Sequence, residues 1–192
     1  MQNKVTIWLS TKQVLHAMNL EEDYISARNK FYAMHRRIRE KGQSCASENF
    51  TSQYFFCNWA MQQKGHNNRD VDGRFWQLDK DIIGDGSFYS EYACCFVPAV
   101  LNTFIYKKSF GSGIVVNRGR FVARIRKRGI RTDLIRTTNY KEALTCYQNA
   151  KVEYLMELSN EYFDTVDYRV FPSLLLKLTN SFTLDIFHSY FG

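Results

Sequence analysis

Residues Gly119–Arg131 read GRFVARIRKRGIR, and their pattern largely decides the fold of the surrounding region. Basic and apolar residues alternate here, and successive side chains of a β-strand point to opposite faces. The pattern therefore predicts a half-buried strand. The side chains predicted on its buried face are Phe121, Ala123 and Ile125. Those predicted on its polar face, which Val122 interrupts, are Arg120, Arg124 and Arg126.

Two further strands are predicted beside this one, at about 113–117 and 130–136, and a long helix over 140–163 follows. Three antiparallel strands are not stable with both faces in water, so the apolar face should pack on the helix. Thr132 and Leu134 are assigned to that face, and Arg131 and Asp133 to the opposite one. The apolar stripe predicted on the helix comprises Ala143, Leu144, Tyr147, Ala150, Tyr154, Leu155 and Leu158. One more helix is expected within 168–191.

Positive charge is concentrated in this same region. The chain has 192 residues and a net charge of +7. Between residues 118 and 136 there are eight basic residues and one acid, Asp133, so this segment alone accounts for the net charge. Such a cluster is typical of a surface that binds a polyanion, because neutralised phosphates release condensed counterions. The alternative interpretation is a solvated sheet edge, although such surfaces usually mix both signs.

The overall composition is that of a folded intracellular protein. Hydrophobic residues make up 45% of the chain, and no apolar run approaches the ~18 residues of a membrane span. The beginning, MQNKVTIWLSTKQ, lacks the apolar core of a secretion signal. The five cysteines show no CxxC spacing, which favours reduced core residues over disulfides or a zinc site. We therefore expect a cytoplasmic location and no membrane partner.

The first half of the chain is predicted to be helical. Apolar residues recur at helical spacing over 22–41, and Gly42 should end that helix. Ser47 or Asn49 can cap a second helix that runs to Gln63. The following stretch, KGHNNRDVDGR, has the composition of a loop.

Residues 75–105 predict a strand, a tight turn, a second strand and a helix. WQLDKDI alternates with period two, GDG is a turn signal, ACCFV reads as a buried strand, and Pro98 stands where a helix can begin. KKSFGSG, at 107–113, is the expected linker. The predicted class is α+β, with N-terminal helices and a ββα unit in 1–106 and the sheet with its long helix in 114–192.

The C-terminal segments resemble a known family. GRFVARIR, GIRTDL and NYKEALTCYQNAKVEYL, within about 112–160, look like the Apetala-type DNA-binding domain, a three-stranded sheet on a helix. The resemblance implies double-stranded DNA as partner. The predicted DNA-binding residues, from the resemblance and the charge cluster together, are Arg120, Arg124, Arg126, Lys127, Arg128 and Arg131. Asp133 departs from the family, which often has a DNA-contacting aromatic there.

The middle segments have a resemblance of their own. FFCNWAMQQKG and WQLDKDIIGDGSFYSEYACCFVPAVLN look like the central region of bacteriophage HNH-type homing endonucleases, which often carry an Apetala-type domain behind it. By this resemblance the ββα unit would hold a divalent metal, Mg²⁺ or Mn²⁺, with Asp79 and Asn102 as ligands and Asp79, Asp81 and Asn102 as the catalytic set. In an extended strand Asp79 and Asp81 would share one face, about 7 Å apart.

The family's general base is a histidine on the first strand, and this chain has none there. Lys80 or Asp81 occupies that place, and His66 lies in the preceding loop. Two hypotheses therefore stand: a metal-dependent, HNH-like DNA endonuclease from a bacteriophage, acting in the host cytoplasm, or an inert descendant that binds DNA and regulates or blocks another factor. RNA binding is a third, less favoured because no aromatic pair stands out for stacking bases.

Overall fold

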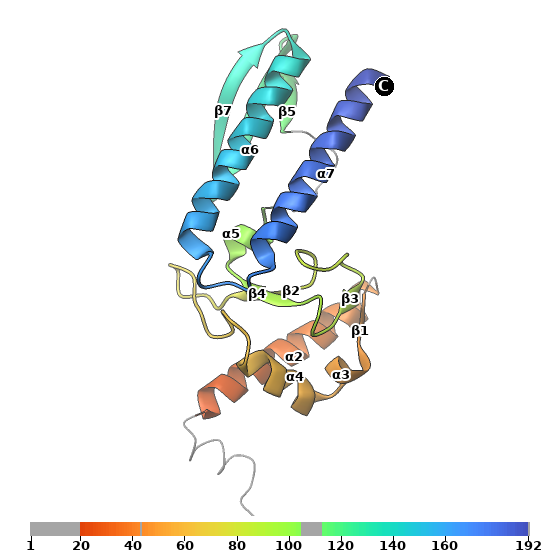
Figure 1. Cartoon of the computed structure of the whole chain (residues 1–192), viewed down its shortest axis with the longest axis vertical. Helices are drawn as coiled ribbons and strands as arrows, with labels where there is room; N and C mark the ends of the chain where they lie inside the picture. Colours follow the sequence, from red (N-terminus) through yellow and green to blue (C-terminus); the bar gives the residue numbers. More distant parts are fainter. Residues whose placement is uncertain (1–19, 43, 105–112, 192) are drawn as a thin grey trace, which may run out of the picture. The chain divides into compact units, whose positions relative to one another are not determined.

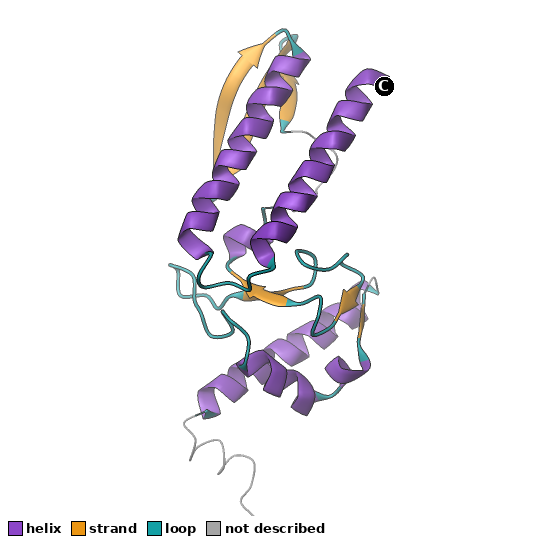
Figure 2. Cartoon of the chain, in the orientation of Figure 1, coloured by secondary structure: helices purple, strands orange, loops and turns teal. Residues whose placement is uncertain are grey.

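The computed structural model describes residues 20–42, 44–104 and 113–191 and divides into two compact units, Met1–Phe96 and Val97–Gly192 (Figure 1). The class is mixed α+β, as predicted (Figure 2). The expected linker, 107–113, lies outside the described residues except for Gly113, and its prediction stays untested. No helix in the described ranges is long and apolar enough to cross a membrane.

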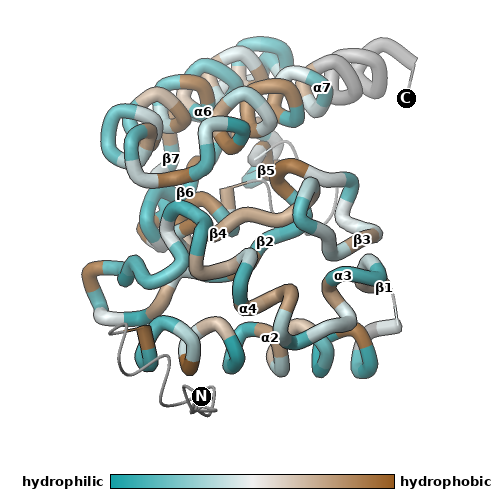
Figure 3. The backbone as a smooth tube through the Cα atoms, turned by 60° about the horizontal axis from the view of Figure 1, so that its bottom comes forward, coloured by the Kyte–Doolittle hydropathy of each residue, from teal (hydrophilic) through white to brown (hydrophobic). Residues whose placement is uncertain are grey.

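In the first unit the longest element is α2 (Glu21–Lys41), which confirms the helix predicted over 22–41. Apolar and polar positions alternate along it (Figure 3), so that Ala27, Phe31 and Met34 are buried. The helix ends at Gly42, which adopts the left-handed conformation with φ of 60° and donates its N–H to the Ile38 carbonyl.

The second predicted helix is divided into α3 (Glu48–Thr51) and α4 (Gln53–Met61). Ser47 caps α3 by accepting from the N–H of Phe50 at 3.3 Å. Ser52 is extended between the two helices and caps α4 by accepting from the N–H of Phe55 at 3.4 Å. Two serine caps five residues apart thus start two helices in place of one.

The core of this unit forms where α2 and α4 meet the short strands. Its aromatic centre is Phe50 and Phe56, whose rings lie 5.0 Å apart, with Trp59 against both. The other buried members are Ala27, Phe31, Met34, Cys57, Ala60, Leu78, Tyr89, Cys94 and Phe96. Only one face of α4 belongs to this core, because Tyr54 and Phe55 are exposed, at 75% and 39%. All five cysteines are free, and Cys45 is exposed.

The strands of residues 45–97 pair differently from the sequence prediction. β1 (Cys45–Ala46) pairs in parallel with β3 (Phe88–Tyr89), and β2 (Gln77–Asp79) pairs with β4 (Cys95–Val97). The order strand, strand, helix is present in β2, β4 and α5 (Ala99–Asn102), but α5 is a single turn after Pro98. The expectation of an extended strand through Ile82 is wrong, because β2 ends at Asp79.

In the second unit β5 (Ile114–Asn117), β6 (Arg120–Lys127) and β7 (Ile130–Thr137) form an antiparallel sheet in that order, which confirms the three predicted strands. Two-residue turns connect them, Arg118–Gly119 and Arg128–Gly129, and all four residues have positive φ. Positive φ at both turn residues is the type I′ geometry, whose twist matches that of the adjoining strands.

The register of this sheet contains one irregularity. Ala123 pairs with Ile135 and Arg124 with Asp133, so Leu134 is an extra residue in β7. The extra residue reverses the alternation beyond it. Ile135 therefore joins the face of Ala123, and Arg136, opposite Val122, joins the face of the arginines. The sequence prediction, which alternated strictly through Leu134, missed this.

The other face of the sheet packs on α6 (Tyr140–Tyr162), which confirms the predicted long helix. Asn139 caps α6 by accepting from the N–H groups of Lys141 and Glu142, at 3.0 and 3.3 Å. The predicted stripe is buried in α6, except that Tyr147 is half-buried. α7 (Val170–Phe191) follows, and Phe171 stacks on Phe163 at 6.2 Å.

Candidate nucleic-acid interface

The sheet face opposite α6 carries five arginines, and we call it the arginine face. The register places its members on one side of the three strands. They are Val115, Asn117, Arg120, Val122, Arg124, Arg126, Arg131, Asp133 and Arg136. Of the predicted DNA-binding residues, the structure thus brings Arg120, Arg124, Arg126 and Arg131 together.

Arg126 and Arg131 are direct cross-strand partners at one end of this face. Arg120 and Arg136 are exposed on it as well. Among the residues that the structure describes, none forms an ion pair or a side-chain hydrogen bond with these four arginines. Like charges that face each other across a strand pair destabilise a sheet. With five arginines and one acid, Asp133, the face holds positive charge that its own residues balance only in part.

The centre of the face is an ion pair. Arg124 donates from Nε to Asp133 Oδ1 at 2.6 Å and from one Nη to Oδ2 at 3.4 Å. The hydrogen bond from Arg124 lowers the pKa of Asp133 below its ordinary value, and the charges of Arg124, Arg131 and Arg136 act in the same direction. Asp133 is therefore ionised at neutral pH.

Lys127 and Arg128 lie on the helix side of the sheet. Lys127 Nζ is 2.7 Å from Glu157 Oε1 on α6 and 5.3 Å from the centre of the Tyr154 ring. The guanidinium of Arg128 pairs with Glu161, and its backbone N–H donates to the Tyr154 hydroxyl at 3.0 Å. Their charges are thus matched by acids of α6.

Arg136 belongs to the arginine face although the sequence analysis did not include it among the DNA-binding residues. Strict alternation from Arg131 puts it on the helix side, and only the register shift at Leu134 moves it. Val122, also on this face, is fully buried between its cross-strand partners Val115 and Arg136.

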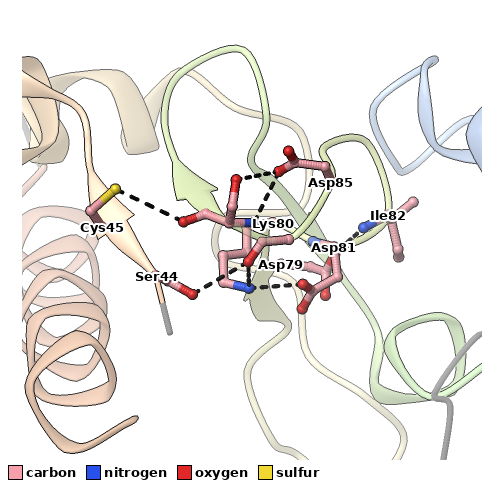
Figure 4. Close-up of polar contacts among 9 residues, drawn as sticks. Ser44, Cys45, Asp79, Lys80, Asp81, Ile82 and Asp85 are labelled. Carbon is pink, nitrogen blue, oxygen red and sulfur yellow. Dashed lines mark hydrogen bonds and ion pairs between the residues drawn. The ribbon is translucent and has the colours of Figure 1, made fainter. Parts of the chain in front are cut away.

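The second predicted site is the turn after β2, and there Asp79 has a structural position. Its side chain is 4% exposed, and its Oδ1 accepts from the N–H groups of Asp81 at 2.9 Å and Ile82 at 2.7 Å (Figure 4). Burial raises the pKa of Asp79, while these backbone hydrogen bonds act against the rise. The Asp79 carboxylate thus stabilises the turn that follows β2 by accepting hydrogen bonds from its backbone.

Lys80 and Asp81 stabilise the loop between Ile82 and Tyr89. Lys80 Nζ donates to Asp81 Oδ1 at 2.8 Å and to the Gly86 carbonyl, and it lies 5.4 Å from the centre of the Tyr89 ring. Gly86 has a φ of 87°, and a Cβ there would lie 2.4 Å from Asp81 Oδ1. The Asp81 side chain could move away from such a Cβ, so it is the positive φ of Gly86 that favours glycine here and agrees with the GDG turn signal.

Asp79, Asp81 and Asn102 do not fit a metal centre. Asp79 is buried and occupied by backbone donors, and Asp81 is paired with Lys80. Asn102 lies at the end of α5, in the second unit, where its N–H donates to the Pro98 carbonyl at 3.1 Å. Within the described ranges no group of three or more His, Cys, Asp or Glu side chains is arranged to hold a metal ion. We derive no catalytic step from these residues.

A buried polar cluster in the first unit was missed by the sequence analysis. Lys30 Nζ donates to Ser26 Oγ at 2.8 Å and to the His66 carbonyl at 2.6 Å. Burial lowers the pKa of Lys30 to about 8 and that of His66 to about 4. His66 is 5% exposed, its ring packs against Phe96, and its Nε2 has no hydrogen-bond partner among the described residues. Nothing in the loop sequence distinguishes it from a solvated histidine.

Comparison with known proteins adds no family to this description. No protein-family model, no characterised protein and no solved structure matches the chain. The function of this chain is therefore inferred from its fold and from the arrangement of its side chains.

Proposed function

We propose that this protein binds double-stranded DNA through the arginine face. The observation that carries the proposal is the cross-strand pair Arg126–Arg131, together with Arg120 and Arg136. None of the four forms an ion pair in the described part of the chain, and the one acid of this face, Asp133, is paired with Arg124. The basic residues of the helix side, by contrast, are each paired with an acid. Lys127 and Arg128 on the helix side are thus both paired with acids, whereas on the arginine face only Arg124 is paired.

Phosphate is the ligand that this arrangement favours. Each directly opposed pair of like charges costs a sheet roughly 0.2 to 1 kcal/mol, and bound phosphates would remove that cost. A twisted antiparallel sheet or ribbon can enter the major groove of B-form DNA, where arginine forks match guanine and the flanking phosphates. The strand register gives the arginine face no aromatic member. Stacking of unpaired bases, the usual basis of single-strand binding, is therefore not favoured.

The salt dependence of DNA affinity tests this proposal. Arg126→Ala/Arg131→Ala removes two charges from the arginine face, and Lys127→Ala/Arg128→Ala removes two charges from the helix side. We expect the first variant to bind a random duplex more weakly and to lower the slope of log affinity against log salt by up to about 2 units. The second variant should keep the slope of the wild type.

The measurement is fluorescence anisotropy with a labelled duplex at several salt concentrations, and circular dichroism checks that both variants are folded. Equal losses of slope in the two variants, or no loss in either, would remove the arginine face from the interface. A duplex RNA and a single strand of the same sequence serve as competitors. Tighter binding of either would replace the duplex DNA assignment.

The endonuclease hypothesis stays a prediction that no contact in the described residues favours. The endonuclease hypothesis and the DNA-binding proposal differ in one property: the first requires metal-dependent cleavage of DNA by the Asp79 region.

A further inference from the structure

The one acid of the arginine face lies at its centre. Asp133 faces Arg124 across the strands, with the Arg126–Arg131 pair on one side of it and the Val122–Arg136 pair on the other. Both members are accessible, with 25% of the Arg124 side chain and 47% of the Asp133 side chain exposed. A carboxylate at this place repels the phosphates that the surrounding arginines would attract, and so lowers affinity for every sequence.

The geometry of the ion pair leaves part of each group available. Arg124 uses Nε and one Nη toward Asp133. A guanidinium has five N–H donors in a fixed plane, so the edge formed by its two Nη atoms remains for a second partner. The contact with Asp133 also fixes the plane of that edge. A fixed arginine fork matches the O6 and N7 acceptors of guanine in the major groove.

Asp133 has complementary chemistry. A carboxylate offers about four lone-pair sites, and the contacts with Arg124 occupy one on each oxygen. The remaining ones can accept only from donors, which among major-groove edges are the amino groups of cytosine and adenine. A phosphate has no donor to offer. Asp133 is therefore suited to a base edge and unsuited to the DNA backbone.

We infer that the Arg124–Asp133 pair reads a base pair and that its preferred partner is guanine–cytosine, with Arg124 donating to guanine and Asp133 accepting from the N4 amino group of cytosine. This inference rests on the proposed function of the arginine face. It divides that face into two roles. Arg120, Arg126, Arg131 and Arg136 bind phosphates and position the sheet, and the central pair provides sequence discrimination.

The test is a selection from a randomised duplex library with the full chain, carried out with the wild type, Asp133→Asn and Arg131→Ala. Affinities are then measured for the enriched duplex and for versions in which each G·C pair is replaced by A·T. We expect the wild type to prefer G·C at one position by roughly 10-fold or more. Asp133→Asn should lose that preference, bind random duplexes more tightly and steepen the salt slope by up to about 1 unit. Arg131→Ala should weaken binding to all sequences alike.

The outcomes separate the two proposals. If the wild type binds duplexes with no base preference, or Asp133→Asn keeps the same preference, the central pair is a structural ion pair and the inference is wrong, while the proposed function stands. If the wild type binds no duplex, both fail. Arg124→Lys is the second variant, because it retains the charge and loses the fork. Loss of the G·C preference without loss of the salt slope in this variant supports the inference, and an unchanged preference overturns it. Thermal melts confirm that each variant is folded.

Discussion

At the scale of single residues, Asp79 shows how the backbone decides what a carboxylate does. The letters QLDKDI place two acids at the spacing of a shared metal site, but β2 ends at Asp79, whose Oδ1 accepts from the N–H groups of Asp81 and Ile82. Whether a short strand continues for two more residues depends on its partner strand and on the turn that follows. The sequence pattern contains neither, so this site could not be predicted from it.

Asp79→Ala should destabilise the first unit by roughly 2 kcal/mol or more. The change leaves the N–H groups of Asp81 and Ile82 without their acceptor, and a buried unsatisfied donor costs about 1 to 3 kcal/mol. Asp79→Asn keeps an acceptor oxygen and should stay within about 1 kcal/mol of the wild type. Urea unfolding measures both. Asp72→Ala is the control, because the ion pair of Asp72 with Arg74 in the same unit is exposed. Equal stability of the Ala variant and the wild type would contradict this structural role.

His66 should make the first unit sensitive to acid. Its pKa of about 4 in the folded chain lies below the ordinary 6.5, because burial disfavours the charged ring and Lys30 is close. The unfolded chain then binds more protons between these values, so stability is lost as pH falls from about 6.5 through about 4. The difference in unfolding free energy between wild type and His66→Phe, measured at pH 7, 5 and 4, isolates this group. This difference should change by about 3 kcal/mol at most between pH 7 and pH 4. A difference that does not depend on pH would show that the His66 ring is exposed to solvent and titrates as in the unfolded chain.

At the scale of elements, the three-stranded sheet was the most predictable part of the chain, but its predicted alternation was wrong beyond Leu134. Alternating residues and the two Arg-Gly turns specify β5, β6 and β7 locally, because a type I′ turn fixes which residues face each other. The extra residue Leu134 has no such local signal. It moves Arg136 to the arginine face, so the candidate site was predicted only in part. α4 was likewise joined to α3 because the sequence did not show that Ser52 would act as a second cap.

Arg118→Asn should stabilise the sheet. Arg118 has a φ of 51°, and asparagine tolerates this left-handed conformation better than arginine does, which is why Asn-Gly is preferred in type I′ turns. We expect a gain of several tenths of a kcal/mol in the free energy of unfolding. Arg118→Ala removes the same charge without the tolerance for positive φ, and it should show no such gain. Thermal unfolding compares the two. If both variants are equally stabilised, the effect comes from charge and not from the turn.

At the scale of the whole molecule, the chain comprises two compact units, and the non-local strand pairings of the first unit are what sequence patterns miss. β1 pairs with β3 across more than forty residues, through two residues on each side. Ser44 and Cys45 contact the backbone of Gly86 and Ser87 in the same way. These contacts join residues far apart in the sequence and so depend on tertiary structure. The helices, with strong periodicity, did not need that information.

The endonuclease hypothesis is tested on the full chain with supercoiled DNA, in magnesium, manganese or chelator, with the double variant Asp79→Asn/Asp81→Asn beside the wild type. We expect salt-sensitive binding by both proteins and no cleavage that depends on metal, because Asp79 serves the backbone and Asp81 serves Lys80. The asparagine variants retain the side-chain shape, so a loss of cleavage could not be attributed to unfolding. Cleavage that requires a metal and disappears in the double variant would show that the turn after β2 rearranges when DNA is bound and would make this protein a nuclease. Cleavage that both proteins share would indicate a contaminating enzyme, and the proposed DNA binding by the arginine face would be unaffected.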